Sequence, residues 1–227
     1  MKKFFGVIIF LLSVLIVRGQ DSEVRSVGSF SGVKAGEAID VYLKRGDKES
    51  VKVEATGTSL SNILTEVSGS YLKIHMRDGR YKGNRNIKVY VTYVSLDRIH
   101  ASSAANIFSD GTIKANTLDI STSSAASIEI VIDAGFTSVD ASSAGDIVLE
   151  GKSKQLEIEV SSAGEIDAYG LECESVRAEA SSAGSAKVSV SKELMAHASS
   201  GGSIRYRGSP SKTNTDSSSG GSVKKSN

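Results

Sequence analysis

A short segment of two serines followed by two small residues returns along this chain at nearly constant intervals. Its serine pairs begin at residues 102, 123, 142, 161, 181, 199 and 218, so the steps between copies are 18 to 21 residues long. Seven copies at such a regular period predict a solenoid, in which each repeat forms one coil of the backbone and packs against its neighbours.

The residues on both sides of each serine pair alternate between apolar and polar. Examples are LEIEV at 156–160 before the pair that begins at residue 161, and GEIDAYG at 164–170 after it. Alternation with a period of two indicates strands, and no part of the array has helical spacing. We therefore predict an all-β fold, a right-handed parallel β-helix with about 19 residues per coil, in which coils pair at about 4.8 Å.

Aligning the coils on their serine pairs predicts which side chains point inward. Apolar residues recur three positions before the pair, one position before it and five positions after its first serine. These three columns are Ile99, Ile120, Val139, Ile158, Ala178, Ala196 and Thr215; Ala101, Thr122, Ala141, Val160, Ala180, Ala198 and Ser217; and Ile107, Ile128, Ile147, Ile166, Ala186, Ile204 and Val223. Stacking like residues fills a narrow interior without gaps, and the columns become smaller or polar at the last coil.

The serine segment itself is predicted to be the tight corner of each coil. Bulky side chains cannot stack inside a sharp bend, and stacked hydroxyls can hydrogen-bond to one another or to the backbone. The alternative is a nucleophilic serine. The coils contain no GxSxG segment, and seven equivalent serines indicate a scaffold, so we predict no catalytic residues.

The N-terminus resembles a secretory signal peptide over residues 1–19, with a basic start, an apolar run from Phe4 to Val17 and small Gly19. An exported protein is expected, in the periplasm, on the outer-membrane surface or secreted, with no transmembrane segment after cleavage. Cleavage removes Lys2, Lys3 and Arg18 and changes the net charge from +1 to −2, which argues against nucleic acid as a partner. The single cysteine, Cys173, shares its parity with Leu171 and is predicted to be a buried structural thiol.

The mature chain is predicted to form one continuous domain. Residues 96–227 make the regular coils, and residues 20–95 make a less regular β region that forms the first coils and caps the N-terminal end. Within it, SLSNILTEV at 59–67 is expected to hold a single helical turn.

These segments together resemble a known family. The chain reads GSFSGVKAGEAIDVYLKRGD, then VKVEA, LKIHM and IKVYVTYVSLDRIHASSA, and then the Ser-Ala-Gly coils. This order is similar to the auto-transporter adhesin head GIN domain family of Bacteroidetes envelopes, over nearly all of residues 28–223. The Gly-Ile-Asn signature of the family appears as Ala38-Ile39-Asp40, and Val94 stands where a proline is often found. The resemblance implies a secreted or periplasmic parallel β-helix and supplies no catalytic residues.

An outward column two positions before the serine pairs is acidic in three successive coils, at Asp140, Glu159 and Glu179. Carboxylates stacked at about 5 Å repel one another unless something neutralises them. A divalent cation could do so, with His197 as a further ligand. The alternative is an ion-pair network in which Arg177 reaches the carboxylates from the neighbouring column. We favour the network, and predict no metal and no cofactor.

Two further surface groups are candidates for binding. Asp146 and Glu165 form a second carboxylate pair in adjacent coils, as in β-helix enzymes that act on glycans, but no aromatic platform or catalytic arginine accompanies them. Lys187, Arg205 and Lys224 share an outward column, and a basic loop follows Met76. These cations could contact anionic glycans or lipid headgroups, or could keep exposed ends soluble.

The sequence thus predicts a non-enzymatic, adhesin-like binding module of the envelope or exterior, with glycans or envelope proteins as partners. Two alternatives stay open: a purely structural envelope component that assembles with other proteins, and a glycan-active enzyme. Ice binding would require the hydroxyl rows to lie on a flat face, whereas the alignment places them at corners. The sequence does not indicate an oligomeric state.

Overall fold

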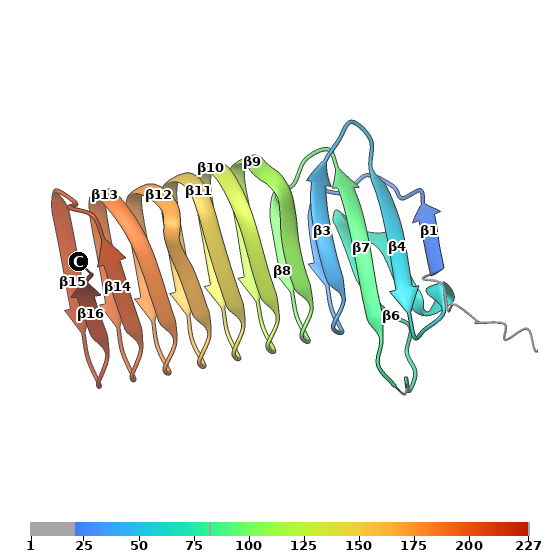
Figure 1. The fold of residues 1–227 in the computed structure, drawn as a ribbon. Coiled ribbons are helices and arrows are strands. Elements are labelled where there is room, and N and C mark those ends of the chain that lie inside the picture. Colours follow the sequence, from blue (N-terminus) through green and yellow to red (C-terminus); the bar gives the residue numbers. More distant parts are fainter. Residues whose placement is uncertain (1–20, 82, 227) are drawn as a thin grey trace, which may run out of the picture.

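Stacked coils of nearly equal length make up most of the molecule (Figure 1). The computed structural model describes residues 21–81 and 83–226, and the predicted signal peptide lies outside them. The long strands are β9 (Asn106–Thr122), β10 (Ser127–Ala141), β11 (Asp146–Val160), β12 (Glu165–Ala180) and β13 (Ser185–Ala198). Each pairs in parallel with the next, and the solenoid has about seven turns of about 19 residues, which confirms the predicted β-solenoid.

The last coils are built from shorter strands. β14 (Ser203–Arg207) and β15 (Lys212–Ser217) both pair with β13, and β16 (Ser222–Lys225) pairs with β14. Every residue of β15 is exposed, including Thr215 and Ser217, whereas their counterparts in the preceding coil, Ala196 and Ala198, are buried. The change to polar residues therefore coincides with the end of the buried interior.

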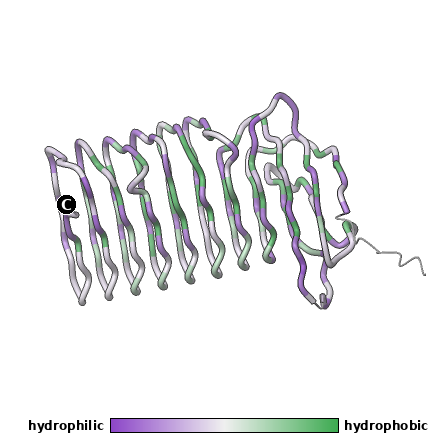
Figure 2. The backbone as a smooth tube through the Cα atoms, in the orientation of Figure 1, coloured by the Kyte–Doolittle hydropathy of each residue, from purple (hydrophilic) through white to green (hydrophobic). Residues whose placement is uncertain are grey.

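The inward columns predicted from the alignment are confirmed as far as Ile204, but the prediction is wrong for the last coil, where Thr215 and Ser217 are exposed and Val223 is half-buried. Ile128, Ile147 and Ile166 are partners in successive coils, and each is 0% exposed. Apolar residues consequently run along the strands of the stack, as the hydropathy colouring shows (Figure 2).

Each serine segment is a tight corner, as predicted, with an unusual backbone. Ser143 and Ala144 have φ values of 51° and 60°, and the Gly145 N–H donates to the Ser142 carbonyl at 2.9 Å, which is the pattern of a type I′ turn. The Ala144 N–H then donates to the Ser162 carbonyl of the next coil at 3.1 Å. The same bond recurs from corner to corner and offsets the cost of holding side-chain-bearing residues at positive φ.

Two details of the predicted corner need correction. The bonds that join successive corners are between backbone groups rather than serine hydroxyls, and the second serine and the alanine are exposed. The fourth position of each corner has little room. The first two corners have buried Ala105 and Ala126 there, whereas a Cβ on Gly184 would lie 2.6 Å from the Val160 carbonyl oxygen, so the closer approach of the later coils favours glycine.

The N-terminal region departs from chain order. β2 (Gly32–Ala35) and β3 (Asp40–Arg45) form a coil that stacks directly on β8 (Arg98–Ala101) and β9. Glu37 and Ala38 have φ values of 64° and 58°, so this coil turns at a corner like those of the serine segments. The strands β6 (Tyr71–Met76) and β7 (Asn86–Tyr93) pair in parallel with its other side.

Antiparallel strands close this end of the solenoid. β4 (Ser50–Thr56) pairs with β7, β5 (Ile63–Ser68) pairs with β6, and β1 (Asp21–Arg25) pairs with β4. A 3-10 turn, η1 (Leu60–Asn62), confirms the expected single helical turn. The sequence predicted a β cap here but not the stacking of residues 32–45 on residues 98–122, which are far apart in the chain.

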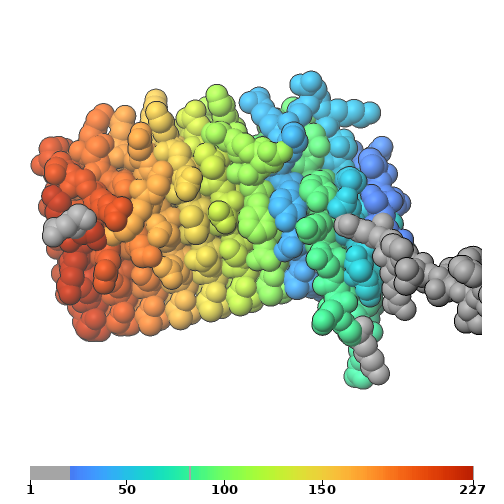
Figure 3. All heavy atoms as spheres, viewed as in Figure 1, coloured from blue at the N-terminus to red at the C-terminus, as the bar shows by residue number. Residues whose placement is uncertain are grey.

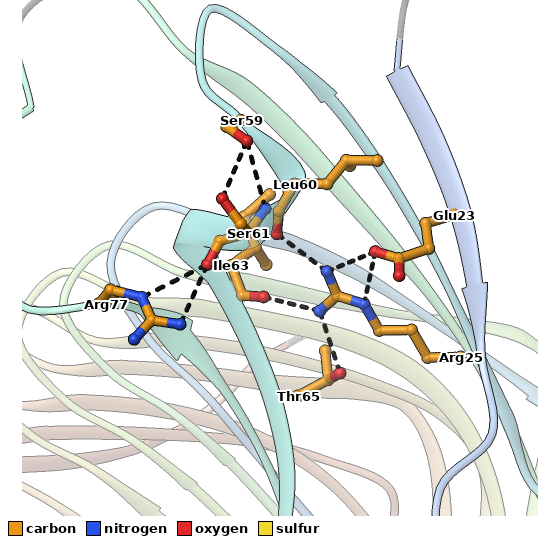
Figure 4. Close-up of polar contacts among 8 residues, drawn as sticks. All are labelled: Glu23, Arg25, Ser59, Leu60, Ser61, Ile63, Thr65 and Arg77. Carbon is orange, nitrogen blue, oxygen red and sulfur yellow. Dashed lines mark hydrogen bonds and ion pairs between the residues drawn. The ribbon is translucent and has the colours of Figure 1, made fainter.

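Arg25 joins β1 to this cap through hydrogen bonds (Figure 4). Its guanidinium donates to the carbonyl of Ile63 at 2.6 Å and of Leu60 at 2.8 Å, and it pairs with Glu23 at 2.8 Å. The Arg25 side chain is only 18% exposed, so these bonds are partly shielded from water.

Candidate binding surfaces

The acidic column lies along one long face of the solenoid. Asp140 is the register partner of Glu159, Glu159 of Glu179, and Glu179 of His197. A shallow hollow of about 290 Å³ lies over these four residues and the adjoining corner serines. The structure therefore places the predicted residues side by side.

Arg177 supplies the positive charge next to this column. Its guanidinium lies 2.6 Å from Glu179 and 3.6 Å from Glu157, and His197 contacts Asp216 at 3.0 Å. Within residues 21–81 and 83–226, no group of three or more His, Cys, Asp or Glu side chains is arranged to hold a metal ion. The contacts are those of the ion-pair network, although no direct pair joins Arg177 to Glu159.

The second carboxylate pair and the basic column lie together on the opposite face. Asp146 and Glu165 are register partners, as are Lys187 with Arg205 and Arg205 with Lys224. Lys187 bridges Glu165 at 2.9 Å and Asp167 at 3.2 Å, and these bonds raise its pKa. Burial, and then the negative charge of Glu165, raise the pKa of Asp146. Lys187 is thus held within an ionic network.

An aromatic row on the same face was missed by the sequence analysis. Tyr42 stacks between Tyr90 and Phe108, with ring centroids 5.2 Å and 5.3 Å apart. The row lies in the outward column that continues through Glu129, Val148 and Asp167 to Lys187. Aligning AIDVYL at 38–43 with AANIFS at 104–109 would have revealed it, because Tyr42 then matches Phe108.

Two larger hollows follow the edge where the coils bend opposite their corners. One, of about 620 Å³, spans β10 to β14, and the other, of about 590 Å³, lies between β9 and the segment that precedes β8; Asp133 lines both. In Figure 1 the tight corners run along the bottom of the stack and the bends along the top. Cys173 lines the first hollow and is buried, as predicted, and burial raises the pKa of its thiol to about 12. This thiol is consequently protonated at neutral pH.

The basic loop between β6 and β7 projects beyond the stack (Figure 3). Arg77 donates to the carbonyl of Ser61 at 3.4 Å, and Arg85 lies 5.1 Å from the ring of Tyr81. Both arginines therefore have partners within the cap. Across the described part of the chain, none of the helical segments has the length and apolar character needed to cross a membrane.

Solved structures of several Bacteroidetes proteins share this architecture. A putative adhesin from Bacteroides fragilis has a similar structure, with a TM-score of 0.80 and 18% identity over 92% of this chain and 98% of the other. A putative adhesin from Parabacteroides merdae gives 0.77 and 17% over 93% and 98%, and a protein from Parabacteroides distasonis described as a putative lipid binding protein gives 0.71 and 17% over the same shares. At these identities the likeness establishes the fold. None of the curated proteins matches the chain.

The comparison with family models goes further than the fold. The model described as "Putative auto-transporter adhesin, head GIN domain" matches residues 29–210, from the first coil to the bend after β14. This match covers most of the chain, including the corner at Ala38 and the Ser-Ala-Gly coils. The chain belongs to the auto-transporter adhesin head GIN domain family.

Proposed function

We propose that this protein is a non-enzymatic binding module that engages glycans or envelope proteins through side chains repeated along its long faces. Family membership implies surface location or export, and this location supports glycans and envelope proteins as the partners we propose. The proposal includes the acidic column with Arg177, the carboxylates Asp146 and Glu165, and the basic column as contact residues.

One observation carries the proposal: equivalent side chains stand in register from coil to coil. The stacked rings of Tyr90, Tyr42 and Phe108 give the spacing directly, at 5.2 Å and 5.3 Å. A ligand that extends along the axis meets a new set of side chains at each coil. Many weak contacts then add up without a deep pocket, which suits adhesion better than turnover.

The carboxylate pair favours binding over catalysis. Lys187 neutralises Glu165 at 2.9 Å, and neither Asp146 nor Glu165 lines any of the hollows described above. A glycoside hydrolase needs two carboxyl groups on opposite sides of an enclosed scissile bond. An open face with a salt-bridged carboxylate supplies contact points instead.

A glycan array with the mature protein tests this function. We expect binding to at least one glycan series, with affinity that rises with chain length because each added unit reaches another coil. Charge reversal of Arg205 and Lys224 should weaken the binding of any acidic glycan. The control is the same change at exposed Lys48, which lies outside the columns. Absence of binding, or affinity independent of length, would contradict the proposal.

A further inference from the structure

From the bent edge of the solenoid we infer that it carries a second, distinct site: an axial groove that binds a neutral, hydroxyl-rich glycan chain. The inference rests on the proposed function, since it names one ligand class and the place where it binds. The groove consists of the 620 Å³ and 590 Å³ hollows, which share Asp133 and follow one column of register partners.

The floor of the groove explains why it is hollow. The register runs through Ala115, Ala134, Ser153, Cys173 and Val190, which are smaller than the isoleucines and leucines of most other inward columns. Uneven coils add to this effect. The coil that contains β12 is longer than the coil that contains β13, and the pairing of these two strands shifts register at the bend. A groove that follows the axis is therefore part of the coil architecture.

The walls carry charges of both signs in balance. The larger hollow is lined by three acidic residues, Asp133, Glu172 and Glu174, and by three basic residues, Lys152, Lys154 and Arg207. Along one wall the signs alternate from Lys114 through Asp133 and Lys152 to Glu172. Such a wall exerts little net attraction on an anion or a cation. It does offer both donors and acceptors to hydroxyl groups, which act as both.

The backbone of the floor argues for a glycan over a peptide. An extended peptide binds a sheet by adding a strand to a free edge. Here the strands at the floor already pair on both sides, since β11 lies between β10 and β12, and β12 lies between β11 and β13. A peptide would find no free row of backbone groups, whereas a glycan needs only the side chains of the walls.

The spacing of these side chains also fits a sugar polymer. Parallel strands lie about 4.8 Å apart, so successive wall residues repeat at roughly the length of one pyranose unit. A chain lying along the groove would therefore place one sugar near each coil, and the hollow beside β10 to β14 would accommodate several units.

Calorimetric titration of the mature protein with neutral oligosaccharides, from disaccharides to octasaccharides, tests the inference. The variant combines Lys152→Ala, Glu172→Ala and Arg207→Ala, all at exposed wall positions, so the fold should persist. We expect at least about tenfold weaker binding, because hydrogen bonds to charged groups contribute about this much. The matched control combines Arg45→Ala, Asp47→Ala and Lys48→Ala, which are exposed at the turn between β3 and β4 and lie outside the groove and the outward columns, and it should bind neutral glycans like the unchanged protein.

The outcomes separate the groove from the general function. Unchanged neutral-glycan binding in the wall variant would overturn the groove while leaving the binding function intact. Binding of acidic glycans or peptides alone, with no neutral glycan bound, would overturn the ligand class. Failure of the unchanged protein to bind any glycan would count against both proposals. Ala134→Phe, which fills the groove from its floor, should give the same loss as the wall variant if circular dichroism shows it folded.

Discussion

The regular coils and the N-terminal region stack their strands in different ways. From β9 onward each coil pairs with the coil that follows it in the chain, through a corner of constant backbone geometry. In the N-terminal region, residues 32–45 pair with residues 98–122 and are flanked by strands that come later in the sequence. The first arrangement needs only a repeated corner, whereas the second depends on particular side chains such as Arg25.

This difference leads us to expect that the two regions respond differently to substitution. A change in the interior of the coils should propagate, because each coil from β9 to β13 is packed on both sides. A change in the cap should remain local, because among the described strands β1 lies at the edge of the sheet and pairs with β4.

The largest effect is expected at the centre of the coils. Ile147→Asp places a carboxylate at a position that is 0% exposed, between Ile128 and Ile166. The charge has no partner there, so we expect a loss of several kcal/mol or an unfolded protein, as measured by urea denaturation. Val148→Lys, on the outward side of the same strand between Glu129 and Asp167, is the control and should retain stability. A stable Ile147→Asp variant would contradict the observed packing.

The sequence alone was sufficient to predict the coils because their signal is repeated. Seven serine segments fix the register, so inward positions such as Ile128 and outward positions such as Glu159 could be assigned by alignment. The order of coils in the cap could not be predicted, since Gly36-Glu37-Ala38-Ile39 turns like a serine corner without resembling one. For the same reason the row of Tyr42, Tyr90 and Phe108 was missed. The groove was also missed, because its floor is defined by the small size of residues that appear unremarkable one by one.

The next effect tests the corners. Gly184→Ala would bring a Cβ within 2.6 Å of a backbone oxygen of the preceding coil, and we expect a destabilisation of about 1–3 kcal/mol. Ala183→Gly is the matched control. It replaces an exposed residue held at φ 62° and should be neutral or slightly stabilising, since the last two corners already have Gly201 and Gly220 at this position. Equal melting temperatures for the two variants would argue against the steric explanation.

A smaller and localised effect is expected in the cap. Arg25→Ala removes the bonds to Leu60 and Ile63, and we expect a total loss of about 1 kcal/mol, because the edge strand β1 can exchange these bonds for bonds to water. Hydrogen exchange should accelerate in β1 and η1 and remain unchanged in β10 to β13. Glu23→Ala, which removes only the exposed partner of Arg25, should have little effect. Acceleration throughout the coils would show that the cap and the stack unfold together.

A pH-dependent effect is expected at Asp146, because burial raises its pKa in the folded state above the ordinary value of 3.8. The ionised carboxylate therefore costs stability above the folded pKa, and this cost disappears as the pH falls below the unfolded pKa. At neutral pH, Asp146→Asn should raise the melting temperature, with a gain of less than about 1 kcal/mol in the free energy of unfolding. This gain in stability should disappear in acid. Glu165→Gln, which breaks the bridge to Lys187, should give no such gain. A gain for Asp146→Asn that is independent of pH would point to packing instead.

The smallest effect is expected in the acidic column, where Arg177 already pairs with Glu157 and Glu179. If these carboxylates form only this ion-pair network and bind no cation, calcium should leave the melting temperature unchanged. Glu159→Gln should then be neutral or slightly stabilising, because it relieves repulsion from Asp140 and Glu179 in the adjacent coils.

A bound cation would act differently, raising stability with concentration by about 2.7 kcal/mol at a hundredfold excess over its dissociation constant. Calorimetry with and without calcium distinguishes the two, and Arg177→Gln sharpens the test. Removing this cation should make the column more receptive to calcium, so a shift in that variant alone would show that Arg177 occupies the role a metal would otherwise have.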